Sequence, residues 1–239
     1  MKALGPVIFL VAAWQAVVSL TGVPPFILPP PLMVLAAARA NVDVLALNAA
    51  VTAGEVLAGL ILGTLTGCAV AVAMALSERL RRFLKPVLVL SQAIPIFALA
   101  PVLTLWLGYG LAPKILITVL IVFFPLASVF LDGLLATPEG LLDLGRIARA
   151  GRWRSLWLLR IPHALPALGA GLGVAAVYAP IGAVIGEWVG AAQGLGYVML
   201  MANARSHADL MFAALFVLVG LTLALYAAAG WIARRLRTP

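Results

Sequence analysis

The sequence predicts an all-α, polytopic membrane protein with about six transmembrane helices. Of its 239 residues, 64% are hydrophobic and only 10% are charged, whereas a typical soluble domain is roughly 45–50% apolar and about 25% charged. A water-soluble fold of this size cannot cover so much apolar surface. The alternating ten-residue segments of an outer-membrane barrel are missing from the sequence, so helices are the predicted spanning elements.

Six segments are apolar enough to cross a bilayer, which takes roughly 20 residues. They are residues 4–20, 49–76, 83–107, 115–135, 164–185 and 210–232. The first is short, and Lys2 before its apolar run leaves a cleaved signal peptide as the alternative, although no small-x-small cleavage site follows. We therefore expect two parts: residues 1–48, with one helix and a Pro-rich external loop, and residues 49–239, with a five-helix core.

Two glycine stripes with a spacing of four residues indicate where these helices pack closely. They are Gly59, Gly63 and Gly67 in the second span, and Gly182, Gly186 and Gly190 near the fifth. Prolines in the third, fourth and fifth spans, such as Pro95, Pro125 and Pro180, remove backbone donors and kink their helices. Kinked helices often line pathways through membranes, although inert membrane helices contain kinks too.

The distribution of Lys and Arg predicts the orientation, because these residues are retained on the cytoplasmic side of short loops. With the N-terminus inside, 13 of the 16 basic residues are cytoplasmic. They are Lys2, Arg79, Arg81, Arg82, Lys85, Arg146, Arg149, Arg152, Arg154, Arg160, Arg234, Arg235 and Arg237. Only Arg39, Lys114 and Arg205 are predicted to lie on the external side of the membrane. Both termini are therefore predicted to be cytoplasmic. The net charge of +8 does not indicate nucleic-acid binding, since the charges lie in separate short loops.

The cytoplasmic loop of residues 136–163 has an amphipathic pattern. Leu141, Leu144 and Ile147 follow helical spacing, and Gly151 offers a break before the pattern resumes. We expect two short amphipathic helices joined at a turn and lying along the membrane face. Their apolar side has to be covered either by lipid headgroups or by a groove on a partner protein.

The same loop resembles the EAA loop of type I ABC importer permeases. The run DLGRIARAGRWRSLWLLRIP, residues 143–162, follows the spacing of the pattern E-A-A-x-x-x-G-x9-I-x-L-P. Asp143 stands at the Glu, Gly145 at the second Ala, and Arg149 at the Gly, which is an outright departure. Ala150 and Gly151 form a small turn, which favours a protein partner over lipid. The resemblance implies an ATPase-coupling site made of Asp143, Gly145, Arg149, Ala150, Gly151, Ile161 and Pro162.

Further segments resemble the nitrate, sulfonate and taurine group of these permeases. They are VPPFILPPP at 23–31, SQAIPIFALAP at 91–101, WLGYG at 106–110, GEWVG at 186–190 and GLGY at 194–197. Within the group, residues 179–190, 202–205 and 209–212 are most similar to permeases assigned to hydroxymethylpyrimidine, a thiamine precursor. Nearly the whole chain takes part, and residues 49–239 correspond to the permease core.

The resemblance implies a permease subunit of the bacterial inner membrane that imports a small solute. Its implied partners are a dimeric ABC ATPase, an external substrate-binding protein, a second permease chain and membrane lipid. The sequence contains no G-x-x-x-x-G-K-[ST] phosphate loop, so ATP is expected to bind the partner subunit, and we expect neither an enzyme nor a cofactor. Permeation of nitrate, a sulfonate, taurine or a riboflavin-like solute is the alternative, and an ion-coupled secondary transporter is a further one.

Polar side chains in the spans are the candidate pathway residues, because ionisable groups inside a membrane usually face a cavity or a partner. The predicted pathway residues are Gln92, Pro95, Glu187 and Trp188. Glu55 and Asp132 lie near the ends of their spans, where the outer and inner headgroups offer a second explanation. His163 and His207 lie on opposite sides of the membrane, so they cannot share a metal ion, and no catalytic constellation appears.

Overall fold

The computed structural model describes residues 4–236 and is built from helices alone over that range. The elements are α1 (Leu4–Thr21), α2 (Pro31–Ala40), α3 (Val42–Leu76), α4 (Glu78–Gln92), α5 (Ile96–Leu107), α6 (Leu111–Leu135), α7 (Glu139–Ile147), α8 (Arg152–Ser155), η1 (Leu156–Arg160), α9 (Ile161–Gly190), α10 (Leu195–Ala204) and α11 (Ala208–Leu236). The predicted all-α class is confirmed. Lys2 and Arg237, which were used for the orientation, lie outside the described residues.

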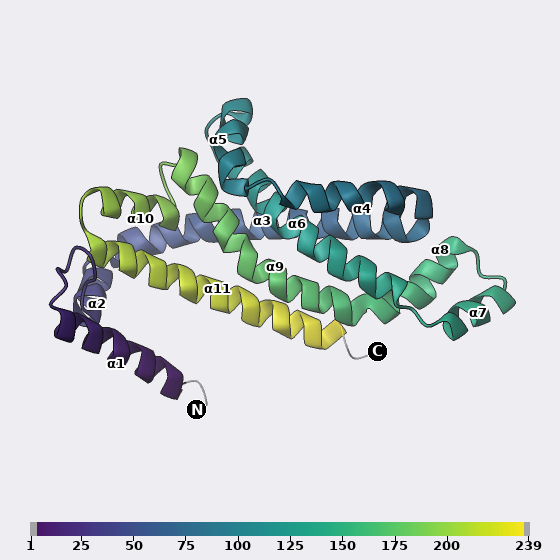
Figure 1. The fold of residues 1–239 in the computed structure, drawn as a ribbon, viewed down its shortest axis with the longest axis horizontal. Helices are drawn as coiled ribbons and strands as arrows, with labels where there is room; N and C mark the ends of the chain where they lie inside the picture. The colour runs from purple at the N-terminus through teal and green to yellow at the C-terminus, as the bar shows by residue number, and fades with distance from the viewer. Residues whose placement is uncertain (1–3, 237–239) are drawn as a thin grey trace.

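The long helices α3, α6, α9 and α11 pack against one another along the length of the molecule (Figure 1). The turn between α7 and α8 stands at one end, and α2 and α10 stand at the other. Four helical segments are long and apolar enough to cross a membrane: α3, α6, the continuous run from Arg152 to Gly190, and α11. These correspond to the second, fourth, fifth and sixth predicted spans.

The third predicted span is two helices rather than one kinked helix. α4 and α5 meet at an angle of 97° and together make either a broken span or a re-entrant loop. Pro95 lies at this elbow and caps the N-terminus of α5 in an extended conformation. Because the residue before a proline is biased away from helical geometry, the break falls at 93–95 rather than inside a continuous helix.

The first predicted span, α1, is a shorter apolar helix. Its Trp14 ring lies 5.8 Å from Phe212 and 5.7 Å from Phe216 of α11, so the helix is held to the core by aromatic packing. The Pro-rich segment after α1 leads through a turn into α2, which starts at Pro31 with Pro30 as its N-cap. Neither α2 nor α10 was expected from the sequence, because each has only 10 residues and is too short to cross a bilayer.

Glycines of both stripes pack against α6, whereas Gly190 lies against Thr104 and Tyr109. A Cβ atom at Gly63 would lie 2.9 Å from Val122, and one at Gly67 would lie 2.9 Å from Leu126. On the other side, a Cβ at Gly182 would lie 2.7 Å from the Cα of Thr118. α6 therefore sits between the backbones of α3 and α9, and the close packing predicted from the stripes is confirmed.

The structure differs from the predicted pair of short amphipathic helices in the second helix. α7 is separate, but α8 runs through one π-helical turn, η1, directly into α9. The Ile161 N–H donates to the Leu156 carbonyl, five residues back, just before Pro162. Since Pro162 has no N–H to donate, a local change from α to π geometry lets the chain continue without a break. The second helix is therefore the base of the fifth span.

Candidate translocation and coupling sites

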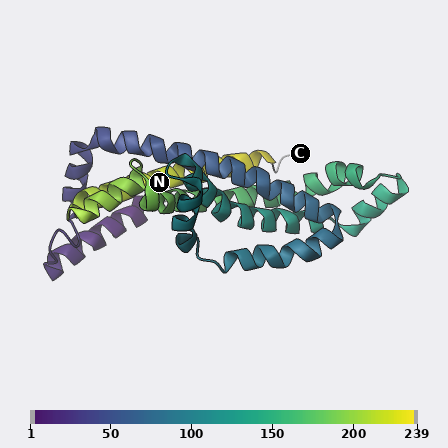
Figure 2. The ribbon, with the colours of Figure 1, turned by 90° about the horizontal axis from the view of Figure 1, so that it is seen from above.

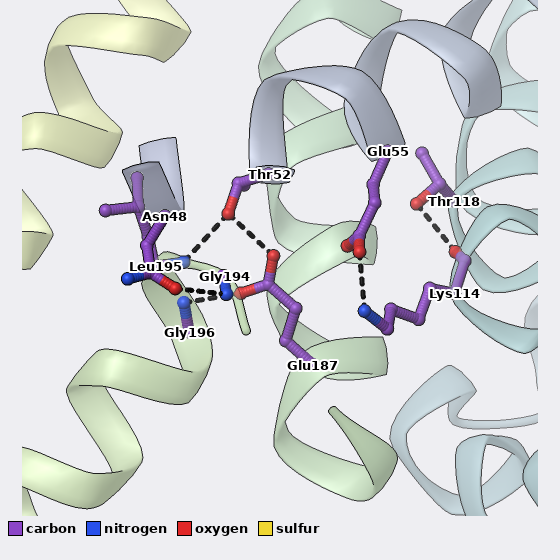
Figure 3. A network of polar contacts seen from close by, with 9 residues as sticks. All are labelled: Asn48, Thr52, Glu55, Lys114, Thr118, Glu187, Gly194, Leu195 and Gly196. Atoms are coloured by element: carbon purple, nitrogen blue, oxygen red, sulfur yellow. Dashed lines mark hydrogen bonds and ion pairs between the residues drawn. The ribbon is translucent and has the colours of Figure 1, made fainter. Parts of the chain in front are cut away.

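Polar side chains of α3 and α9 hold the N-terminus of α10 (Figure 3). The Thr52 hydroxyl donates to Glu187 at 2.6 Å and accepts the Leu195 N–H at 2.8 Å. Glu187 also accepts the Gly196 N–H at 2.5 Å, and Asn48 accepts the Gly194 N–H at 2.7 Å. We call Asn48, Thr52 and Glu187 the polar clamp. It satisfies backbone donors at the start of α10 that have no partner within that helix.

Glycine is required at the contact between α10 and Glu187. Gly194 has a φ of +117°, which L side chains rarely adopt, and a Cβ there would overlap the Glu187 carboxyl group. A Cβ at Gly196 would lie 2.7 Å from Glu187 Oε2. The predicted motif GLGY at 194–197 thus lets the backbone approach a buried carboxylate.

A buried ion pair lies beside the polar clamp. Lys114 Nζ of α6 contacts Glu55 Oε1 of α3 at 2.5 Å, with side chains only 8% and 1% exposed (Figure 3). The second oxygen, Glu55 Oε2, has no partner among the described residues. The sequence assigned Lys114 to an external loop, but the structure corrects this, because α6 begins at Leu111 and takes Lys114 into its first turn.

The predicted coupling turn after α7 has the hydrogen bonds of a Schellman motif. The Ala150 N–H donates to the Gly145 carbonyl at 2.8 Å, and the Arg149 N–H donates to the Arg146 carbonyl at 3.0 Å. Arg149 has a φ of +51°, the left-handed conformation that such a turn demands at this position. Arg149 therefore adopts a conformation that Gly, the residue of the family pattern at this position, adopts at less cost.

The remaining predicted coupling residues surround that turn. Gly145 is buried, and a Cβ there would lie 2.9 Å from Leu159 Cδ1, which explains a small residue at this position. Asp143 is exposed and pairs with Arg146 at 2.6 Å. Gly151 has no atom near its missing Cβ, so its surface is open. Ile161 and Pro162 begin α9, which fixes the turn directly beneath a membrane span.

Comparison with known proteins identifies the chain. Residues 59–238 match the family described as "Binding-protein-dependent transport system inner membrane component". The chain belongs to this family. A probable ABC transporter permease of Haemophilus influenzae is 45% identical over 95% of this chain and 92% of the relative. The formylaminopyrimidine transport permease ThiX of Halalkalibacterium halodurans is 33% identical over 91% of this chain and 88% of the relative.

The fold of the permease agrees with a solved transporter. An inward-facing structure of the MetNI methionine ABC transporter superposes with a TM-score of 0.73 at 21% sequence identity, covering 82% of this chain and 97% of that one. At this identity the likeness concerns the fold. The riboflavin transport permease RibX of Chloroflexus aurantiacus is 35% identical over 95% of this chain and 85% of the relative.

The predicted pathway residues of the permease separate into two groups. Gln92 and Pro95 are exposed at the α4–α5 elbow, and Trp188 is exposed beside Phe97 of α5, with ring centroids 6.4 Å apart. Glu187 is 1% exposed and points to α3 and α10 instead. The side chains of Gln92, Pro95 and Trp188 are thus accessible at the surface of the single chain. The contacts of Glu187 support a bracing function within one chain, and its predicted pathway role stays a prediction.

Sequence reasoning missed Asn48, Thr52 and Lys114 as members of a polar cluster. Asn48 and Thr52 lie one turn apart on α3, and Glu55 follows on the next turn, so a helical polar stripe was present in the sequence. An unsatisfied polar stripe in an apolar helix indicates a partner helix. The partners themselves lie 59 to 146 residues away in the sequence.

Proposed function

We propose that the permease imports a hydroxymethylpyrimidine-like compound, as one of two permease chains served by an ABC ATPase and an external substrate-binding protein. Two relatives, at 33% and 35% identity, are named for formylaminopyrimidine and riboflavin, which are both nitrogen heterocycles. The taurine permease TauC of Escherichia coli is less similar, at 28% identity.

The pairing of Lys114 with Glu55 is the observation that carries the substrate proposal. An unpaired lysine in the spans would favour an anion such as nitrate or a sulfonate, whereas this one is neutralised inside the chain. Apolar and aromatic side chains such as Phe97 and Trp188 are left on the surface of the α5–α9 region. Such a surface suits a neutral heteroaromatic ring better than an anion.

Growth of a pyrimidine-requiring thiamine auxotroph tests this substrate. Expression of the permease with its ATPase and binding protein should restore growth on micromolar hydroxymethylpyrimidine, since uptake then limits growth. Control strains lacking either the permease or the ATPase should not grow. Restored use of taurine or nitrate as sole sulfur or nitrogen source, without rescue of the auxotroph, would refute the assignment. Uptake that persists without any ATPase would favour an ion-coupled transporter instead.

Coupling to the ATPase is proposed at the turn between α7 and α8. Leu141, Leu144 and Ile147 form an exposed apolar stripe on α7, and Ile147 is 80% exposed. Gly151→Trp should prevent docking of the ATPase, because the large side chain would project into the space that the partner has to occupy. The permease itself should fold normally, since no atom of its own chain lies near a Cβ at this position. The measurement is co-purification of the ATPase. Gly220→Trp on α11 is the matched control, since its surroundings are equally open.

The cytoplasmic position of that turn is a separate part of the proposal. After replacement of Cys68 by Ala, Arg154→Cys should react with a membrane-impermeant thiol reagent only in inverted vesicles. Arg205→Cys, near the opposite end of the molecule, should react only in intact cells. The reverse pattern would contradict the predicted orientation and leave the substrate assignment untouched.

A further inference from the structure

A cleft of about 1040 Å³ lies where α3 turns into α4 and where α7 meets α8. Its size reaches the upper end of small-ligand pockets, which are roughly 300–1,000 Å³. Figure 2 shows α4 folding back from the end of α3 that faces α7 and α8. Five arginines and one carboxylate line the cleft, which we call the basic cleft. They are Arg79, Arg81, Arg146, Arg152, Arg160 and Glu78.

Most of this positive charge is not neutralised within the chain. In the described residues, Arg79, Arg81 and Arg152 have no ion pair and donate no side-chain hydrogen bond. Glu78 is engaged by Arg82, which is not part of the lining. The cleft thus gathers three free guanidinium groups from two helices. Guanidinium groups present fixed forks of donors that match phosphate oxygens.

The walls of the cleft are partly apolar, which distinguishes it from a site for a free ion. Leu76, Leu135 and Leu142 contribute to the lining beside the arginines. Next to it, Trp153 and Trp157 are exposed at a spacing of four residues on the base of the fifth span. Exposed tryptophans at the end of a span mark the headgroup layer of a membrane. The arginines therefore lie at the depth of lipid phosphates, with apolar surface next to them.

The exposed apolar stripe of α7 and the basic cleft use different faces of that helix. Leu142 and Arg146 of α7 line the cleft, whereas Leu141, Leu144 and Ile147 are exposed elsewhere on the helix. With 100° of rotation per residue, these two sets point in nearly opposite directions. A partner protein on the apolar stripe would leave the basic cleft accessible from the membrane.

We propose that the basic cleft binds the headgroup of an anionic phospholipid, with an acyl chain against Leu76 and Leu135. Such a lipid would join Arg79 and Arg81 of α4 to Arg152 of α8, and so hold the coupling turn at a fixed height below the span. The placement of this lipid in the cytoplasmic leaflet rests on the orientation proposed above, whereas the binding of the lipid does not. Basic pockets between spans on the cytoplasmic side are known to recognise acidic lipid headgroups.

Native mass spectrometry of the full-length permease in detergent tests the proposal. Phosphatidylglycerol should bind with higher affinity than phosphatidylcholine. The variant R79Q/R81Q/R152Q should lose affinity for phosphatidylglycerol on the order of 100-fold, because each basic residue near an anionic lipid surface contributes roughly a fivefold factor. The variant R79K/R81K/R152K keeps the charge and should retain most of the binding. That result would show that the glutamine variant loses affinity through its lost charge and not through misfolding.

Matched charge removal outside the cleft provides the control. K85Q/R154Q/R234Q also removes three positive charges, and none of these residues lines the cleft. It should leave the affinity for phosphatidylglycerol unchanged. Equal losses in both glutamine variants would overturn the site and indicate only a net-charge effect. Full displacement of the lipid by millimolar inorganic phosphate would assign the cleft to a free anion and overturn the lipid proposal.

Discussion

At the α10 end of the permease, Asn48, Thr52 and Glu187 are buried and bonded to backbone groups, whereas at the α7–α8 end the arginines of the basic cleft are open and mostly unpaired. Both regions are polar parts of a chain that is 64% hydrophobic. The difference follows from the surroundings. Inside the helix bundle a polar group without a partner costs free energy, because hydrocarbon offers no hydrogen bonds. At the membrane surface, water and lipid phosphates supply partners.

The largest effect is expected at the buried ion pair. Glu55→Ala should lower the free energy of unfolding by about 3–5 kcal/mol, because it leaves the Lys114 ammonium buried without a counter-charge. Thermal unfolding of the purified permease, followed by tryptophan fluorescence, measures this. Arg82→Ala is the control at an exposed pair, whose side chains are 78% and 61% exposed, and should cost under about 1 kcal/mol.

A double variant sharpens the same comparison. Glu55→Leu combined with Lys114→Met removes both charges and should recover most of the stability, because apolar replacement of a buried pair is often neutral. If the double variant is as unstable as Glu55→Ala, the pair is needed for its hydrogen bonds rather than for mutual neutralisation. If Glu55→Ala has no effect, the pair is open to water and the buried assignment is wrong.

A smaller effect is expected at the polar clamp. Thr52→Val keeps the shape of the side chain but removes the hydroxyl, which leaves the Leu195 N–H without an acceptor and Glu187 Oε1 without its donor, while Glu187 Oε2 keeps the Gly196 N–H. The expected loss of stability is about 1–3 kcal/mol. Faster hydrogen exchange confined to α10 would show that the clamp has opened.

Thr66→Val is the matched control for the clamp. Thr66 lies on the same helix, is exposed, and donates only to the Leu62 and Gly63 carbonyls of its own helix. Its replacement should change stability by less than about 0.5 kcal/mol. Equal effects of the two valine variants would show that Thr52 acts through helix propensity rather than by holding α10.

The smallest effect is expected at the coupling turn. Arg149→Gly should stabilise α7 by about 1 kcal/mol, because glycine adopts the left-handed conformation of this position without steric cost. Slower hydrogen exchange of the α7 amides measures this. Arg146→Gly, inside the helix, should have the opposite sign and a similar size. Destabilisation by both glycines would mean that the Arg149 side chain makes contacts that outweigh its backbone strain.

The sequence by itself determined the features that depend on local composition. Hydropathy located the long spans, since burial in hydrocarbon requires an apolar run of a given length. The spacing of Gly59, Gly63 and Gly67 predicted a close helix contact, because i and i+4 positions share a helix face. The amphipathic pattern after residue 136 likewise predicted α7 and its turn.

Only the tertiary structure decided which distant groups meet. The sequence predicted Lys114 to lie in a loop, whereas α6 starts at Leu111 and places Lys114 beside Glu55. The bond from the Gly196 N–H to the Glu187 carboxylate exists only because α10 folds back against α9. The basic cleft likewise needs α4 and α8 to lie at the same end of the bundle. Such pairings depend on relative depth and rotation of packed helices, and these are properties of the whole bundle rather than of any one segment.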